Sequence, residues 1–162
     1  MAVATRVNER VERLRASLEE PLLVTVGVNV RYLTGLASSN AALFVDEERA
    51  LLFTDFRYAE AARGIDGVEF VQTQRFLLNT VGQQLNGRRI GFEASALNYD
   101  GWEKLGDAGV ELVPRRGLVE KLRAVKDDAE LATIREVARI TDEAFAALAE
   151  ERFIGRTERD LS

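Results

Sequence analysis

The sequence contains no histidine and no cysteine. Without histidine, the chain cannot form a Ser-His-Asp or Cys-His catalytic unit, or a zinc or manganese site with a histidine ligand. Without cysteine, it has neither a disulfide framework nor thiolate chemistry, which fits a reducing compartment. The chemistries that remain use Asp, Glu, Lys or Tyr, and no compact group of carboxylates in the sequence suggests a metal site.

Positive charge is also in short supply. The chain carries 22 Lys and Arg against 27 Asp and Glu, a net charge of −5, so it has no broad positive field to gather phosphates. The first fifteen residues are charged throughout and lack the apolar segment of a signal peptide. The longest apolar run, residues 22–30, is far shorter than the roughly 20 residues that span a bilayer. We therefore expect no nucleic-acid partner, no membrane contact and a cytoplasmic location.

Helix and strand patterns alternate along most of the chain. Apolar residues three or four apart predict an amphipathic helix over residues 4–19, ended by Pro21. Strands are predicted at residues 22–26, 41–45, 50–54, 68–72, 89–93 and 110–113, and further helices at 56–63, 76–86 and 99–106. The strands at 41–45 and 50–54 are expected to form an antiparallel hairpin. The fold class is therefore α/β, a mixed β-sheet with helices on both faces.

The pattern changes after Pro114. A short helical piece at 117–124 is followed by a long helix that Asp127 or Asp128 caps and that runs to about Glu151. Its apolar stripe is wider than one contact requires, so it predicts neighbours on more than one side. Thr157 then begins a further helix that the sequence cuts off. We expect two domains, residues 1–124 and 125–162, the second incomplete.

Four segments in this order resemble the N-terminal domain of creatinase, prolidase and aminopeptidase P. They are Asn29-Val30-Arg31-Tyr32-Leu33-Thr34-Gly35 with Ser38-Ser39-Asn40, Leu52-Phe53-Thr54-Asp55-Phe56-Arg57-Tyr58, Ile90-Gly91-Phe92-Glu93, and Leu122-Arg123-Ala124-Val125-Lys126-Asp127 with Glu130, Ile134 and Ala138. Together they cover nearly the whole chain, and the ordered set is more specific than any one of them.

The resemblance implies a two-domain Xaa-Pro metallopeptidase. Its catalytic "pita-bread" domain holds two divalent metals, Mn, Co or Zn, through two Asp, one His and two Glu, and hydrolyses short proline-containing peptides. None of those ligands is in this sequence. The resemblance therefore implies that this chain is the non-catalytic N-terminal domain, followed by the linker and first helix of the catalytic domain. It also implies a homodimer in which a loop of this domain gates the partner's active site.

The resemblance also selects candidate site residues. Asn29, Arg31 and Tyr32, with Ser38, Ser39 and Asn40, match the gating loop. Arg57 and Tyr58 are candidates for the dimer interface, and Phe145 and Leu148 for contact with the catalytic domain. Three of the six gating candidates have a simpler interpretation, since small polar residues such as Ser38-Ser39-Asn40 are good turn formers. Arg31 and Tyr32 have one as well, as a surface arginine and a packed tyrosine.

Three other residues invite a functional interpretation and have a structural alternative. Asp55 stands directly before a predicted helix, where a cap is the simpler role than catalysis. Glu93 ends a strand without a paired acid or base. Trp102, the only tryptophan, is expected to be a core anchor.

Two functional alternatives share the same outline. One is a catalytically inactive relative that binds peptide or protein segments. The other is a creatinase-like amidinohydrolase, which acts on a small guanidino substrate without metals. The sequence beyond the present chain would separate them from the peptidase, because only the peptidase needs the metal ligands.

Overall fold

The computed structural model describes residues 2–151 and 153–161. The chain forms two compact units, Met1–Ala124 and Val125–Ser162, called unit 1 and unit 2 below. Within the described ranges, no helix combines the length and the apolar character needed to cross a membrane.

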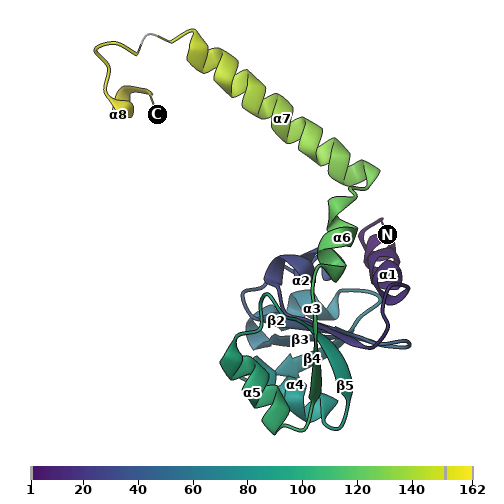
Figure 1. The fold of residues 1–162 in the computed structure, drawn as a ribbon. Helices are drawn as coiled ribbons and strands as arrows, with labels where there is room; N and C mark the ends of the chain where they lie inside the picture. Colours follow the sequence, from purple (N-terminus) through teal and green to yellow (C-terminus); the bar gives the residue numbers. More distant parts are fainter. Residues whose placement is uncertain (1, 152, 162) are drawn as a thin grey trace. The chain divides into compact units, whose positions relative to one another are not determined.

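Unit 1 is built on a six-stranded sheet of order β4-β3-β2-β1-β5-β6 (Figure 1). The strands are β1 Leu22–Val24, β2 Ala41–Val45, β3 Ala50–Asp55, β4 Glu69–Thr73, β5 Arg89–Glu93 and β6 Glu111–Arg115. Only β2 runs antiparallel to its neighbours, while β1, β3, β4, β5 and β6 all point the same way. Five strands therefore end at one edge of the sheet, which we call the carboxyl edge, and begin at the opposite amino edge.

Helices cover both faces of this sheet (Figure 1). The elements of unit 1 are α1 Ala2–Arg15, α2 Gly27–Thr34, the 3₁₀ helix η1 Phe56–Tyr58, α3 Ala59–Arg63, α4 Leu77–Leu85, α5 Tyr99–Asp107 and α6 Leu118–Ala124. The period-2 alternation of the strands divides the core between the two faces. Leu22 and Val24 pack with α1, α2 and α6 on one face, whereas Leu23 packs with α4 and α5 on the other. The predicted fold class is confirmed.

Unit 2 consists of α7 Asp128–Ala149 and α8 Glu158–Leu161. Asp127 caps α7 through a reciprocal capping box with Glu130, in which each side chain accepts a hydrogen bond from the other residue's backbone N–H, at 2.8 and 3.0 Å. The apolar side chains of α7 are largely exposed, including Ile134, Phe145 and Leu148.

One helix was not predicted. Asn29, Arg31 and Tyr32, which the resemblance matched to the gating loop, lie on the helix α2. Its N-terminal residue Val26 offers no side-chain cap, and valine, threonine and tyrosine are not strong helix formers. The helix ends at Gly35, whose φ of 77° is the left-handed conformation typical of a helix C-terminus.

Candidate functional site

The carboxyl edge concentrates the buried polar side chains of unit 1. Among the described residues these are Asn29, Thr34, Thr54, Asp55, Thr73 and Glu93. Four of them end strands β3, β4 and β5, while Asn29 lies in the first turn of α2 and Thr34 is the last residue of that helix. Ligand sites of open α/β sheets lie outside the carboxyl ends of strands, so this edge is the candidate site.

Asp55 is the centre of the first cluster. Its carboxylate is almost fully buried, and four donors surround it. Arg57 donates its backbone N–H to Oδ1 (3.0 Å), its Nε to Oδ1 (3.0 Å) and its Nη2 to Oδ2 (2.8 Å), while Asn40 Nδ2 donates to Oδ2 (2.7 Å). The hydrogen bonds from Arg57, followed by that from Asn40, hold the pKa of Asp55 well below its usual range. Asp55 is thus the N-cap of η1, as predicted, and it also accepts a hydrogen bond from Asn40, which lies outside that helix.

The segment 36–40 is bound to the same cluster. Thr54 Oγ1 donates to the Asn40 carbonyl (2.7 Å), and the Asn40 N–H donates to Ser38 Oγ (3.0 Å). The hydroxyls of Ser39 and Tyr58 lie 2.9 Å apart, and this hydrogen bond lowers the pKa of the Tyr58 phenol. Two sets of residues that the sequence assigned separately, 38–40 and 57–58, therefore form one site.

Glu93 is the centre of the second cluster. Its Oε2 accepts the N–H groups of Thr25 and Val26, each at 2.7 Å, and its Oε1 accepts Asn29 Nδ2 at 2.6 Å. Burial raises the pKa of Glu93, and these hydrogen bonds offset the rise only in part. The carboxylate therefore fixes the chain that enters α2.

Asn29 extends this cluster to α6. It is fully buried, its Nδ2 also donates to Glu120 Oε1 (2.7 Å), and its Oδ1 accepts from Arg123 Nη1 (2.9 Å). Sequence reasoning missed the roles of Glu120 and Arg123, which lie more than ninety positions from Asn29. Arg123 lies in a segment already matched to the family, whereas no signal in the sequence pointed to Glu120.

The remaining gating candidates differ in exposure. Arg31 is exposed on α2, whereas the Tyr32 ring is buried, with the Arg10 guanidinium 4.2 Å from its centroid. Ser39 is exposed, and Ser38 and Asn40 are half-buried. Arg31, Ser38 and Ser39 are therefore the candidates best placed to meet another molecule, while Asn29 and Tyr32 support them from behind.

The carboxyl edge also carries the exposed apolar side chains of unit 1. Among residues 7–124 these are Val28, Phe56, Phe76, Tyr99 and Trp102, and each follows the carboxyl end of a strand. Tyr99 and Trp102 contact each other with ring centroids 5.9 Å apart. The prediction that Trp102 anchors the core is wrong, since it is 44% exposed. Gly101 and Leu105 occupy the buried side of α5, and this turns Trp102 outward.

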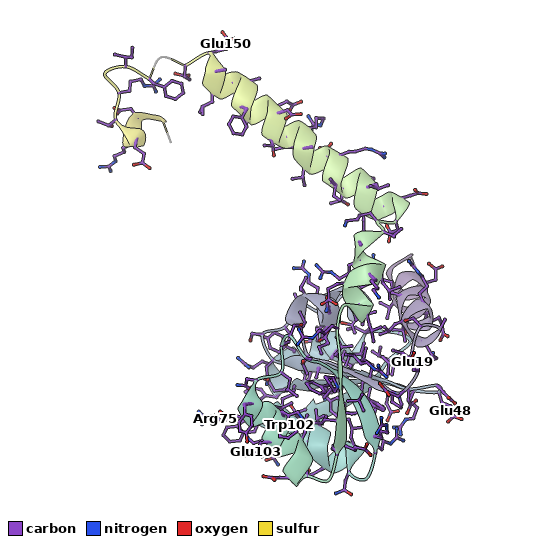
Figure 2. The ribbon with its side chains drawn as sticks, viewed as in Figure 1. Glu19, Glu48, Arg75, Trp102, Glu103 and Glu150 are labelled. Carbon is purple, nitrogen blue, oxygen red and sulfur yellow. The ribbon has the colours of Figure 1, made fainter. Side chains whose placement is uncertain are left out.

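The amino edge differs in composition. Figure 2 shows Glu19 and Glu48 on this side of unit 1 and Arg75, Trp102 and Glu103 on the other. A cleft of about 570 Å³ lies here, lined mainly by charged residues. Asp46 Oδ2 pairs with Arg88 at 2.8 Å and its Oδ1 accepts the turn N–H groups of Glu48 and Arg49, so its carboxylate serves the β2–β3 turn.

The described residues offer no group of three His, Cys, Asp or Glu side chains that could hold a metal ion. Asp55 and Glu93 each face hydrogen-bond donors of the chain itself, which leaves no lone pair directed at a common point. Residues 2–151 and 153–161 therefore do not fit a resident metal.

Comparison with known proteins identifies relatives that cover most of the chain. The model of the creatinase/prolidase N-terminal domain family matches residues 10–125. The Xaa-Pro dipeptidase of Bacillus anthracis is 31% identical and superposes with a TM-score of 0.87 over 96% of this chain and 46% of that one. The N-terminal domain of the cytoplasmic peptidase PepQ of Mycobacterium tuberculosis H37Rv is 33% identical, with a TM-score of 0.63 over 71% of this chain and 98% of that one.

A curated relative agrees with these structures. The uncharacterized peptidase YqhT of Bacillus subtilis is 34% identical over 132 residues, which are 76% of this chain and 37% of the relative. The chain thus spans less than half the length of YqhT and of the Bacillus anthracis enzyme.

Proposed function

The chain belongs to the creatinase/prolidase N-terminal domain family, and from that membership we propose that it is the non-catalytic domain of an Xaa-Pro metallopeptidase. The observation that carries the proposal is the similarity to the Bacillus anthracis Xaa-Pro dipeptidase, which extends over 96% of this chain. Because unit 2 falls within that match, the likeness is not confined to the sheet. By the likeness to PepQ, the proposal includes a cytoplasmic location.

In this proposal unit 2 begins the catalytic domain. The exposed apolar face of α7, with Phe145 and Leu148, is the surface that the rest of that domain would cover. The two divalent metals, Mn, Co or Zn, would be bound there, where a metal pair supplies Lewis-acid and water-activating chemistry. This chain contributes no ligand to them and acts on the substrate's access alone.

The proposed role of the carboxyl edge is to gate the partner's active site in a homodimer. Arg31 and Ser39 supply exposed polar groups, Ser38 supplies a half-buried one, and Arg57 and Tyr58 extend the same cluster toward a partner. Exposed aromatic residues on the same edge support an interface role, because aromatics and arginine are enriched at protein–protein contacts. A segment held across the entrance of the partner's active site would admit short proline-containing peptides and exclude folded chains.

The proposal is tested first by the mass of the native protein. An antibody raised against this chain should detect a band of roughly twice its 18.0 kDa in the source cells, since the chain spans 46% of the dipeptidase it resembles. The purified native protein should then hydrolyse Xaa-Pro dipeptides, lose that activity with a chelator and regain it with Mn²⁺. A band at 18.0 kDa would contradict the proposal.

The same preparation separates the two alternatives. A long protein that binds proline-containing peptides without cleaving them would be the inactive binding relative. One that hydrolyses creatine and is indifferent to chelation would be the amidinohydrolase.

A further inference from the structure

Segment 36–40 would be expected to be loose on sequence grounds, because it is a short connection between a glycine and a strand and ends in three small polar residues. In the structure, hydrogen bonds hold the last residue of this segment, Asn40. The Asn40 side chain is held by Asp55, and the Asn40 carbonyl is held by the neighbouring Thr54 hydroxyl. The Asn40 N–H in turn holds Ser38 Oγ, so the constraint passes from strand β3 back along the segment.

We infer that Asp55 is the positioning residue of segment 36–40: its buried carboxylate joins this segment to the Arg57 guanidinium and so presents Ser38 and Ser39 in one fixed arrangement. The inference rests on the proposed gating function, which it deepens by naming the residue that shapes the gate. Asp55 itself does not contact the substrate in this scheme. It acts through Asn40 on one side and through Arg57, next to Tyr58, on the other.

The chemistry around Asp55 makes a carboxylate necessary. Its side-chain contacts within the cluster are all donors, namely the Asn40 amide, the Arg57 backbone N–H and the Arg57 guanidinium. A carboxylate offers two acceptor oxygens and no donor, which matches this set. An amide offers one oxygen, and in either orientation its NH₂ group would face a donor of Arg57, while Asn40 could keep a bond only by turning its own amide and without the charge of the acceptor.

This reasoning defines the test variant and its control. Asp55→Asn keeps the shape of the side chain but breaks one side of the cluster. Asp46→Asn is the matched control, because Asp46 also accepts backbone N–H groups and an arginine but stands at the other end of the same β2–β3 hairpin. Both variants remove one negative charge from one hairpin.

Hydrogen–deuterium exchange of the 162-residue chain gives the readout. In Asp55→Asn, we expect the backbone amides of residues 36–40 to exchange about ten- to hundredfold faster, the range for losing a hydrogen bond to a charged group. The central amides of β2 and β3 should keep their protection. In Asp46→Asn, the change should be confined to the turn at residues 46–49.

A compensating pair distinguishes positioning from general support of the fold. In the double variant Asn40→Asp with Asp55→Asn, the amide and the carboxylate exchange places, so the bond between the two side chains can form again. Protection of residues 36–40 should return toward that of the wild type. If the double variant exchanges as fast as Asp55→Asn, the proposed link is wrong.

Two results would overturn the inference. One is faster exchange of residues 56–58 in Asp55→Asn with residues 36–40 unchanged, because Asp55 would then be only the cap of η1. The other result comes from Asn40→Ala, which removes the same hydrogen bond from the side of the segment and serves if Asp55→Asn fails to fold. Unchanged exchange of residues 36–40 in Asn40→Ala would overturn the inference.

These exchange measurements do not depend on catalysis, so they test the positioning role of Asp55 independently of the proposed function. In the longer protein, the expected effect of Asp55→Asn is a several-fold change in KM for Xaa-Pro dipeptides with kcat altered less. A loosened segment 36–40 with unchanged KM would support positioning by Asp55 and contradict gating.

Discussion

The two edges of the sheet in unit 1 are made from the same strands but carry different chemistry. At the amino edge, charged side chains pair near the surface, Asp46 with Arg88 and Glu69 with Arg49. At the carboxyl edge, Asp55, Glu93 and Asn29 are buried and hydrogen-bonded, and aromatic rings are exposed beside them. Burial of polar groups is costly unless each is satisfied, so the carboxyl edge is where this fold holds a specific arrangement rather than a solvated surface.

The largest expected difference between the edges concerns two asparagines. Asn29→Ala should lower the free energy of unfolding by about 3 kcal/mol, because it removes the three hydrogen bonds that the buried Asn29 makes to Glu93, Glu120 and Arg123. Asn86→Ala removes one exposed hydrogen bond to the Ala108 carbonyl at the amino edge and should cost about 0.5–1 kcal/mol. Urea unfolding of both variants measures the difference. Equal costs would mean that the carboxyl-edge network adds nothing beyond a single bond.

The second expected difference is between two buried carboxylates of the carboxyl edge, Glu93 and Asp55, whose contributions to stability depend on pH in opposite directions. The pKa of Glu93 is raised from 4.5, so the folded state holds its proton better, and its contribution to stability is present below 4.5 and lost as pH rises through the folded pKa. The pKa of Asp55 is lowered from 3.8, so its contribution is present above 3.8 and lost as pH falls toward the folded pKa.

The variants Glu93→Gln and Asp55→Asn test this contrast. The stability of the wild type relative to Glu93→Gln should fall as the pH rises above 4.5. Relative to Asp55→Asn it should be highest at neutral pH and shrink below pH 3.8. Thermal unfolding across this pH range gives both curves, and parallel curves would remove the distinction.

A smaller effect is expected for the exposed aromatics. Trp102→Ala should cost about 1 kcal/mol or less, the contribution of its contact with Tyr99 and partial burial. Leu105→Ala on the same helix is the control and should cost about 2–5 kcal/mol, since Leu105 is fully buried. A comparable cost for Trp102 would mean that it supports the core and is not available to a partner.

The smallest effect belongs to a surface ion pair at the amino edge. Arg49 and Glu69 lie 2.9 Å apart with both side chains about half exposed. Glu69→Gln should change stability by less than about 0.5 kcal/mol, and the change should vanish in high salt. Urea unfolding at two salt concentrations measures this.

How far the sequence predicted this structure depends on the range of the interactions involved. Strands β2 and β5 were predicted to the residue, because alternating or continuous apolar runs are local signals. Helix α2 was missed because the carboxylate that receives the N–H groups before it, Glu93, lies 67 and 68 positions away. The exposure of Trp102 was missed because it depends on which side of α5 meets α4, where Gly101 lets the Leu78 side chain approach closely.

The candidate site shows the same contrast between local signals, which the sequence reveals, and long-range contacts, which it does not. Its residues could be selected from the sequence because the family segments contain them, and the capping role of Asp55 follows from its place before a helix. That Asn40 and Arg57 share the Asp55 carboxylate could not be predicted, since it requires the register in which Ala41 lies opposite Thr54.

The single reversed strand, β2, gives this domain an adjustable part. Every other strand leaves the sheet at the carboxyl edge, but β2 enters there, so segment 36–40 lies between Gly35 at the end of α2 and a strand whose register β1 and β3 set together. Residues inserted between positions 37 and 38 would lengthen the segment without shifting that register or any core residue. Evolution, or an engineer who grafts a longer segment, can therefore change its reach while the scaffold that carries it stays the same.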